Sequence, residues 1–186
     1  IEEAKIMHRL GSMENSHIVP AYDSFKNDQT DTWYYVMPFY SNGSLSDLQH
    51  TDFSFTEELV TKQIVLPLCR ALHIAHKEKV LHLDIKPDNI LIDNDGNAVL
   101  IDFGVAKQYD NEGLILNEEG LKSCSEFAAP ELQTEGAMVR FGAQTDIYGL
   151  AASIYSLLAF PADPHPIMDF SNQDWDIRKC LQKAHC

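Results

Sequence analysis

Apolar residues near the start of the chain follow first a helical and then a strand-like spacing. Residues 1–13 carry apolar side chains three and four positions apart between charged ones, which predicts an amphipathic helix. Residues 18–25 and 33–39 are rich in aromatic and β-branched residues and enclose the polar stretch 26–32, so they predict two strands joined by a turn.

Two helices are predicted next. Residues 44–50 read as a short helix with Ser44 as its N-cap, and residues 56–78 as a longer one that begins at Thr56. Pro67 is predicted to interrupt the longer helix, because a proline inside a helix costs about 3 kcal/mol and usually kinks it.

The second half of the chain is less regular. Residues 105–128 have little periodicity and many polar residues, which predicts a long functional loop. Residues 144–160 are apolar almost throughout, as expected of a buried helix, and residues 174–185 have the spacing of a final amphipathic helix. His73 and His76, in the helix predicted at 56–78, are interpreted as packing or surface residues and not as metal ligands.

A hairpin is the strongest short-range signal. Two apolar runs, 90–92 and 98–101, flank a polar turn that contains Asp95-Gly96, a dipeptide typical of tight hairpin turns.

Four polar side chains are predicted to meet at the open end of this hairpin. Asn89 and Asp102 lie equally far from its turn, so a regular hairpin places them side by side, and Asp84 and Lys86 approach from the preceding loop. Two carboxylates, an amide and an ammonium can hold a divalent metal through oxygen ligands, accept a proton and neutralise a phosphate.

These residues fall in motifs that resemble the catalytic core of protein kinases. In chain order the motifs are His82-Leu83-Asp84 followed by Lys86 and Asn89, then Asp102-Phe103-Gly104, then Ala129-Pro130-Glu131. Each motif alone can occur by chance, but their order, spacing and intervening hairpin support one another. The sequence is similar to bacterial serine/threonine kinases of the eukaryotic (Hanks) type.

The resemblance implies an α+β, protein-kinase-like fold. Residues 1–40 would form part of the small lobe and the hinge, with one helix and the last two strands of that lobe. Residues 41–186 would form a mainly α-helical large lobe. The 186 residues contain no glycine-rich loop, no lysine-bearing strand before Glu3 and no final large-lobe helices, so the sequence is expected to be an inactive fragment truncated at both ends.

The resemblance also implies an activity, the transfer of the γ-phosphate of Mg-ATP to a serine or threonine hydroxyl of a protein. Asp84, Lys86, Asn89 and Asp102 would be the catalytic residues, with Asp84 on the acceptor hydroxyl and Lys86 on the transferred phosphate. Asn89 and Asp102 would also hold Mg²⁺.

Further residues would contact the ATP. Glu3 would pair with the lysine that positions ATP, and Met37 would guard the back of the adenine pocket. The backbone of Pro38 and of Tyr40 would hydrogen-bond the adenine edge, and Leu91 of the hairpin would contact the nucleotide.

Three positions bear on regulation and on the shape of the site. Leu83 replaces an arginine that in the family grips a phosphorylated activation loop, and Cys124 replaces a threonine that bridges the catalytic aspartate and lysine. Asp146 would accept backbone N–H groups of the catalytic loop. The alternative for Asp146 is a surface acid at a helix N-terminus.

Two functions therefore stay open. One is an active kinase, and the alternative is a pseudokinase that uses the same fold as a binding or scaffold module. The four polar residues favour the first, because an unused metal site has no reason to keep its ligands aligned. A non-kinase enzyme with paired carboxylates is a remote third.

Composition limits the partners. The chain has 28 acidic and 14 basic residues and a formal net charge of −14, which argues against nucleic acid and fits a basic polypeptide substrate, although solubility alone explains the charge equally well. Its four cysteines show no C-x-x-C spacing, which is typical of reduced thiols in a cytoplasmic protein. The sequence has no apolar run of membrane-spanning length.

Overall fold

A computed structural model describes residues 2–51, 53–109, 115–116, 125–133 and 140–159. The predictions for Cys124 and for a helix at 174–185 fall outside these residues. The predicted division into two lobes at residue 40 stays a prediction.

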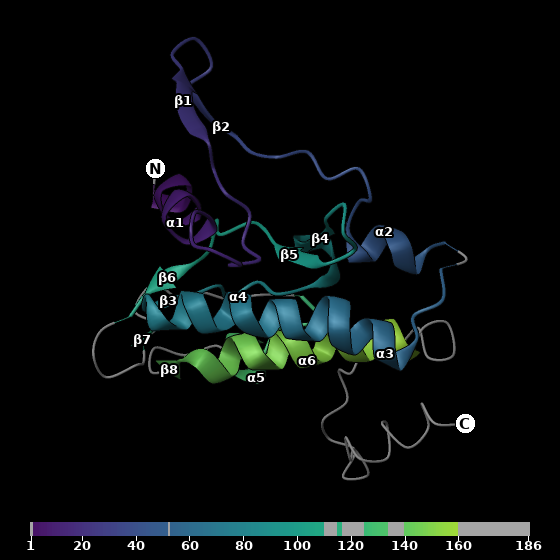
Figure 1. Ribbon diagram of the computed structural model, residues 1–186. Coiled ribbons are helices and arrows are strands. Elements are labelled where there is room, and N and C mark those ends of the chain that lie inside the picture. Colours follow the sequence, from purple (N-terminus) through teal and green to yellow (C-terminus); the bar gives the residue numbers. More distant parts are fainter. Residues whose placement is uncertain (1, 52, 110–114, 117–124, 134–139, 160–186) are drawn as a thin grey trace.

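The first described unit is a helix beside a strand pair (Figure 1). Helix α1, Glu2–Gly11, buries Ile6, Met7 and Leu10, as its spacing predicts. Strands β1, Asp23–Asn27, and β2, Thr32–Val36, pair antiparallel.

The first predicted strand begins later than expected, and the prediction for residues 18–22 is wrong. Pro20 has no N–H to donate to a ladder. Residues 17–19 pair elsewhere: the Val19 N–H donates to the Leu100 carbonyl at 2.9 Å, and the Leu100 N–H donates to the His17 carbonyl at 2.8 Å. These bonds attach the segment after α1 to the central hairpin.

Helix α2, Leu45–Gln49, begins where the sequence predicts. The Ser44 Oγ accepts the Asp47 N–H at 3.1 Å, and the Asp47 Oδ2 accepts the Ser44 N–H at 2.8 Å. This reciprocal pair is a capping box.

The helix predicted at 56–78 consists of three consecutive segments. They are α3, Glu57–Leu59, a π-helix η1, Val60–Val65, and α4, Leu66–Lys77. Thr56 caps the start, as predicted, because its Oγ1 accepts the Leu59 N–H at 3.3 Å. A proline ring clashes with the carbonyl four residues earlier in a regular α-helix, and the wider π turn just before Pro67 relieves that clash.

The predicted hairpin forms the centre of the molecule. Strands β4, Ile90–Ile92, and β5, Ala98–Leu100, pair antiparallel. Before them come β3, Val80–Leu81, and a 3₁₀ turn η2, Pro87–Asn89. After them, β6, Lys107–Gln108, pairs with β3.

The register of the hairpin differs by one residue from the predicted one. The Ile101 N–H donates to the Asn89 carbonyl at 3.0 Å, so Asn89 lies opposite Ile101 and not opposite Asp102. The cause is a three-residue loop, 94–96, in which Gly96 takes the left-handed φ of +85°. A two-residue turn would have produced the expected pairing.

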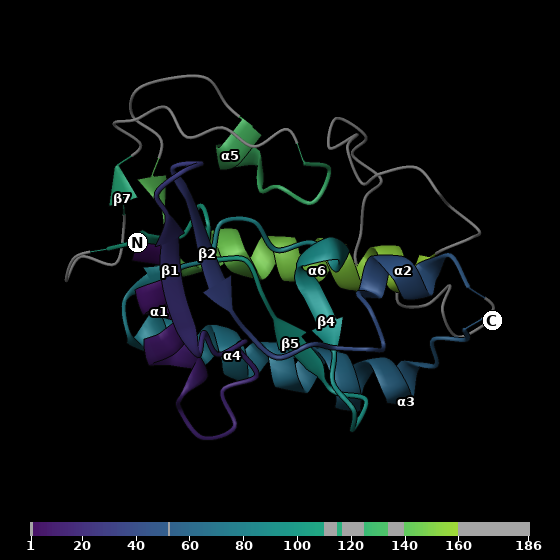
Figure 2. The same ribbon diagram turned by 90° about the horizontal axis from the view of Figure 1, so that it is seen from above.

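Helix α6, Ala143–Ala159, lies alongside α4 beneath the central hairpin (Figures 1 and 2). Helix α5, Pro130–Gln133, precedes it, and strands β7, Ile115–Leu116, and β8, Arg140–Phe141, pair antiparallel. Strands β6 and β7 lie within the predicted loop 105–128, and two-residue strands are too short to show a period. Among the described residues, no helix has both the length and the apolar composition to cross a membrane.

Two buried clusters hold these elements together. The larger one joins α1, α4, the central hairpin and α6, with Met7, Leu72, Leu100 and Leu150 among its members. The smaller one lies under the segment that follows β3, and its members are Leu81, Leu83, Ala128, Leu132 and Phe141. In the sequence, Leu83 stands out only because it replaces an arginine of the family. In the structure it is a core residue.

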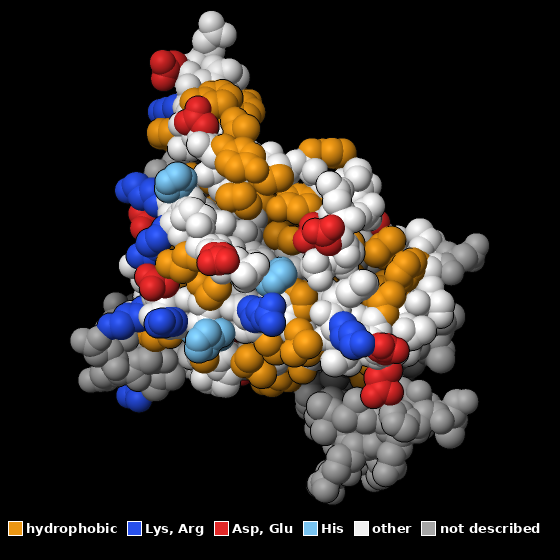
Figure 3. All heavy atoms as spheres, viewed as in Figure 1, with side chains coloured by type: hydrophobic (Ala, Val, Ile, Leu, Met, Phe, Trp, Pro, Cys, Tyr) orange, Lys and Arg blue, Asp and Glu red, His pale blue; other side chains and the backbone are white. Residues whose placement is uncertain are grey.

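The β1–β2 hairpin is much less buried. Phe25, Trp33 and Tyr34 are each about half exposed, and hydrophobic side chains gather over this hairpin in Figure 3. The Phe25 and Tyr34 rings stack with their centroids 5.5 Å apart.

Candidate active site

Asp84 lies in the loop that follows β3, residues 82–89, here called the Asp84 loop. The Lys86 Nζ donates to the Asp84 Oδ2 at 2.8 Å. The Asn89 Nδ2 donates to the same oxygen at 2.9 Å and to the Asp84 carbonyl at 2.8 Å. Among the described residues, the Asp84 Oδ1 accepts no hydrogen bond, so within this part of the chain only one carboxylate oxygen is held.

Asp102 lies one residue past the Asn89–Ile101 pair and is exposed. Its φ of +64° is in the left-handed region, which is uncommon for a residue other than glycine. The Asp102 Oδ1 accepts the Gly104 N–H at 3.1 Å. The structure therefore joins Asp84, Lys86 and Asn89 by hydrogen bonds and places Asp102 at the adjacent hairpin end, without a hydrogen bond to those three.

Glu3 reaches this end of the hairpin from α1. A Cβ atom added at Gly104 would lie 3.0 Å from the Asp102 Oδ1 and 3.8 Å from the Glu3 Oε2. The absence of a side chain at Gly104 thus leaves room for the Asp102 carboxylate, and the Glu3 carboxylate lies close to the same point. The Tyr35 hydroxyl donates to the Glu3 Oε1 at 3.1 Å. Burial, followed by the charge of Glu3 and its hydrogen bond, raises the pKa of Tyr35 to about 12.

His82 fixes the Asp84 loop to the hairpin. It is fully buried, and its Nε2 lies 2.9 Å from the Ile101 carbonyl. The Asp84 N–H donates to the His82 Nδ1 at 3.3 Å, so the hydrogen bonds assign the ring proton to Nε2. The edge of the ring meets Phe103, with the centroids 4.7 Å apart.

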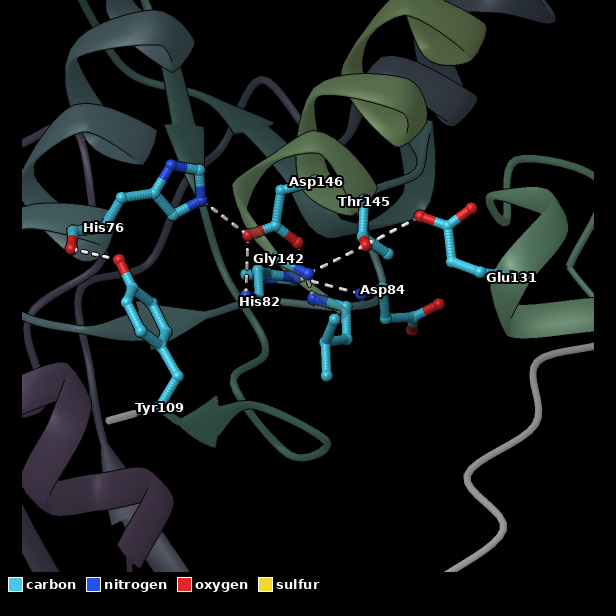
Figure 4. A network of polar contacts seen from close by, with 9 residues as sticks. His76, His82, Asp84, Tyr109, Glu131, Gly142, Thr145 and Asp146 are labelled. Carbon is cyan, nitrogen blue, oxygen red and sulfur yellow. Dashed lines mark hydrogen bonds and ion pairs between the residues drawn. The ribbon is translucent and has the colours of Figure 1, made fainter. Parts of the chain in front are cut away.

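Asp146, in the first turn of α6, holds the backbone of the same loop (Figure 4). Its Oδ1 accepts the Leu83 N–H at 2.8 Å, and its Oδ2 accepts the His82 N–H at 2.9 Å. The side chain is only 1% exposed, so the prediction that Asp146 shapes the loop is confirmed and the surface-acid alternative is wrong.

His76 is a third partner of Asp146, and sequence reasoning missed it. The His76 Nε2 lies 2.8 Å from the Asp146 Oδ2, and the Tyr109 hydroxyl donates to the His76 carbonyl. No local signal could have identified this contact, because the two side chains are 70 residues apart in the chain. His76 is a packing residue, as interpreted, but one that contacts a buried carboxylate.

Thr145 points the opposite way from Asp146, toward α5 (Figure 4). Its Oγ1 donates to the Glu131 Oε1 at 2.8 Å and accepts the Gly142 N–H at 3.3 Å. Two consecutive residues of α6 thus hold the Asp84 loop on one side and α5 on the other.

Replacing Thr145 by valine is expected to lower the free energy of unfolding by about 1–3 kcal/mol, because the buried Gly142 N–H loses its acceptor and the half-buried Glu131 carboxylate loses a donor. Thr145→Ser keeps the hydroxyl and should lose less. Chemical denaturation of the two variants checks this, and a loss for Thr145→Ser as large as that for Thr145→Val would mean that the methyl group matters as much as the hydroxyl.

The profile of the protein kinase domain matches residues 1–182 of the chain. The chain belongs to the protein kinase family. The kinase-like α+β fold and the resemblance to eukaryotic-type serine/threonine kinases are thereby confirmed.

Three serine/threonine-protein kinases illustrate the similarity. The chain is 28% identical to a probable one of Dictyostelium discoideum over 85% of the chain and 21% of the relative. It is 27% identical to PknB of Mycobacterium leprae over 79% of the chain and 23% of that protein. It is 27% identical to ppk34 of Schizosaccharomyces pombe over 94% of the chain and 53% of that protein. The chain thus spans between about a fifth and a half of these relatives.

The kinase residues predicted to contact adenine lie on the connection from β2 to α2 and on β4. Met37 is 37% exposed, and the Tyr40 carbonyl accepts the Gly43 N–H at 3.3 Å, which turns the chain after Pro38. The Gly43 carbonyl in turn accepts an N–H from β4 at 3.0 Å. Leu91 lies on β4 with its side chain on the face opposite its two buried neighbours. The adenine contacts themselves stay predictions.

The oxygens at the hairpin end fit magnesium. The Asn89 Nδ2 donates to Asp84 twice, which leaves the Asn89 Oδ1 as an acceptor, and Asp102 supplies a carboxylate at the same end of the hairpin. Magnesium prefers oxygen ligands and usually binds one or two protein groups together with substrate phosphates. Within the described ranges there is no group of three or more His, Cys, Asp or Glu residues that could hold a metal by itself.

Proposed function

We propose that this kinase domain transfers the γ-phosphate of Mg-ATP to a serine or threonine hydroxyl of a protein. The observation that carries the proposal is the position of the Asp84 carboxylate. Its Oδ2 accepts hydrogen bonds from Lys86 and Asn89, while its Oδ1 accepts none from the described residues. A side chain fixed in this way can act on a hydroxyl without reorganising first.

Each residue has a separate role in the proposed reaction. Asp84 orients the acceptor hydroxyl and takes its proton. Lys86, whose ammonium lies 2.8 Å from the Asp84 Oδ2, neutralises charge on the transferred phosphate next to the attacking oxygen. Asn89 and Asp102 hold Mg²⁺, which when bound neutralises charge on the nucleotide phosphates.

Magnesium binding should require nucleotide. Two protein oxygens are too few for a tight Mg²⁺ site, so calorimetry should detect binding only when ATP is present. Asp102→Asn should weaken the nucleotide-dependent binding, whereas Asp95→Asn, in the turn of the same hairpin, should not. Tight Mg²⁺ binding without nucleotide would show that the metal assignment is wrong.

The substrate and the location are also part of the proposal. The net charge of −14 favours a basic protein segment around the target hydroxyl, since opposite charge speeds the encounter. The reduced-thiol cysteine pattern favours the cytoplasm.

A transfer assay tests the function. The protein as its gene encodes it is incubated with labelled ATP, Mg²⁺ and two serine peptides that differ only in having basic or acidic flanking residues. Label on the basic peptide that depends on Asp84 supports the proposal. Nucleotide binding without transfer to any protein would instead favour the pseudokinase.

A further inference from the structure

We propose that Tyr35 is a positioning residue of the active site, which fixes the Glu3 carboxylate so that one of its oxygens faces the Asp102-Phe103-Gly104 segment. The proposal rests on the function proposed above. It assigns to a tyrosine of β2 a role that none of the sequence motifs includes.

The two oxygens of Glu3 are used differently. The Tyr35 hydroxyl donates to Oε1 at 3.1 Å, across 32 positions of sequence. The other oxygen, Oε2, is the one that comes within 3.8 Å of the place a side chain at Gly104 would occupy. Tyr35 therefore hydrogen-bonds Oε1 and leaves Oε2, the oxygen nearer to Gly104, able to bind a cation in the active site.

Tyr35 is well placed for this role by its strand. It is the only residue of β2 that is not exposed, and its ring packs against the main buried cluster. Side chains alternate along a strand, so the neighbouring Tyr34 points to the opposite face, where it stacks on Phe25. The ring of Tyr35 is thus held by packing, and its hydroxyl is aimed at α1.

The Tyr35 hydroxyl also attaches the first turn of α1 to the strand pair. The described side-chain bonds between α1 and the chain leading into β1 are at its later half: the His8 Nδ1 lies 3.1 Å from the Ala21 carbonyl, and the Ser16 Oγ donates to the Gly11 carbonyl at 3.5 Å. Glu3 is in the first turn. Without the Tyr35 hydroxyl, that turn has no polar bond to the strand pair among the described residues.

The charges explain why a donor is required. Glu3 and Asp102 approach the same point beside Gly104, and two carboxylates repel each other. The pKa of Tyr35 is raised to about 12 by burial and then by Glu3, so the hydroxyl keeps its proton at physiological pH. A protonated hydroxyl can donate a hydrogen bond, and it holds the Glu3 Oε1 in place.

Four variants test the proposal in the protein as its gene encodes it. They are Tyr35→Phe, Glu3→Gln, the double variant, and the matched control Tyr34→Phe. Tyr35→Phe should lower kcat/KM for ATP about tenfold, which corresponds to about 1.4 kcal/mol, while Tyr34→Phe should stay within about twofold of the wild type. In the Glu3→Gln background, Tyr35→Phe should add less than about twofold, because it acts through the carboxylate.

The outcomes separate the two proposals. An unchanged kcat/KM for Tyr35→Phe, or an equal loss with and without Glu3, overturns the positioning role even though the kinase function stands. If the wild type binds Mg-ATP but transfers nothing, the proposed function fails. The positioning role is then tested by the dissociation constants for Mg-ATP, which should rise in Tyr35→Phe, stay unchanged in Tyr34→Phe, and rise little further when Tyr35→Phe is added to Glu3→Gln. A wild type that neither transfers phosphate nor binds nucleotide overturns both.

Discussion

Asp84→Ala is expected to lower phosphoryl transfer by about 10²–10⁴-fold while leaving the affinity for Mg-ATP nearly unchanged. The carboxylate acts on the acceptor hydroxyl, and none of its contacts in the structure is to a residue predicted to touch adenine. The Asn89 amide would still donate to the backbone carbonyl of residue 84, so the loop should keep its shape. Single-turnover kinetics and nucleotide titration measure the two quantities.

Asp88 provides the matched control for this experiment. It is an exposed acid in η2, only four positions further along the same loop. Asp88→Ala should transfer phosphate at nearly the wild-type rate, since it removes the same charge without touching Lys86 or Asn89. A comparable loss in both variants would show that the rate depends on the charge of the loop and not on Asp84. A parallel loss of ATP affinity in Asp84→Ala would make Asp84 a structural residue.

The parts of the fold that local sequence predicts are those whose signals lie within one element. Ser44 and Thr56 start their helices as expected, because each side chain bonds an N–H three residues further on. The prediction of the central hairpin is also confirmed, because its signal, an Asp-Gly turn between two apolar runs, lies within a short stretch of sequence. Its register is not, because the Asp93 carboxylate accepts the N–H groups of Asp95 and Asn97 and so selects a longer loop than the Asp-Gly pair alone predicts.

Contacts between segments that are distant in the sequence could not be predicted from it. Neither the pairing of residues 17–19 with Leu100 nor the contact of His76 with Asp146 has a local pattern. The resemblance did supply Asp146, since the family assigns it a role, but it said nothing of Tyr35.

The first turn of α6 is where these distant contacts meet. Asp146 holds the backbone of the Asp84 loop, and Thr145 holds Glu131 of α5. The proposed active site therefore depends on a helix that supplies none of its predicted catalytic residues. Any loosening of this turn should move Asp84 and α5 together.

Removal of the Asp146 carboxylate should consequently destabilise the protein severely. Asp146→Ala leaves two buried backbone N–H groups and the His76 ring without their acceptor, and breaking a buried charged network of this kind costs about 3–5 kcal/mol. That is a large share of the roughly 5–15 kcal/mol by which a folded domain is stable. Phosphoryl transfer should fall with it even where the variant still folds, because the Asp84 loop loses its anchor.

The size of the loss measures how much the hydrogen bonds of Asp146 to the loop contribute to stability. An acid that merely interacts with the dipole at a helix N-terminus contributes about 0.3–1 kcal/mol. Denaturation of Asp146→Ala and Asp146→Asn should give a loss above that range for both, smaller for asparagine because it keeps one acceptor oxygen. Gln144→Ala, exposed in the same turn, is the control and should change stability by less than about 0.5 kcal/mol. A loss below 1 kcal/mol for Asp146→Ala would mean that the loop holds its shape without this carboxylate.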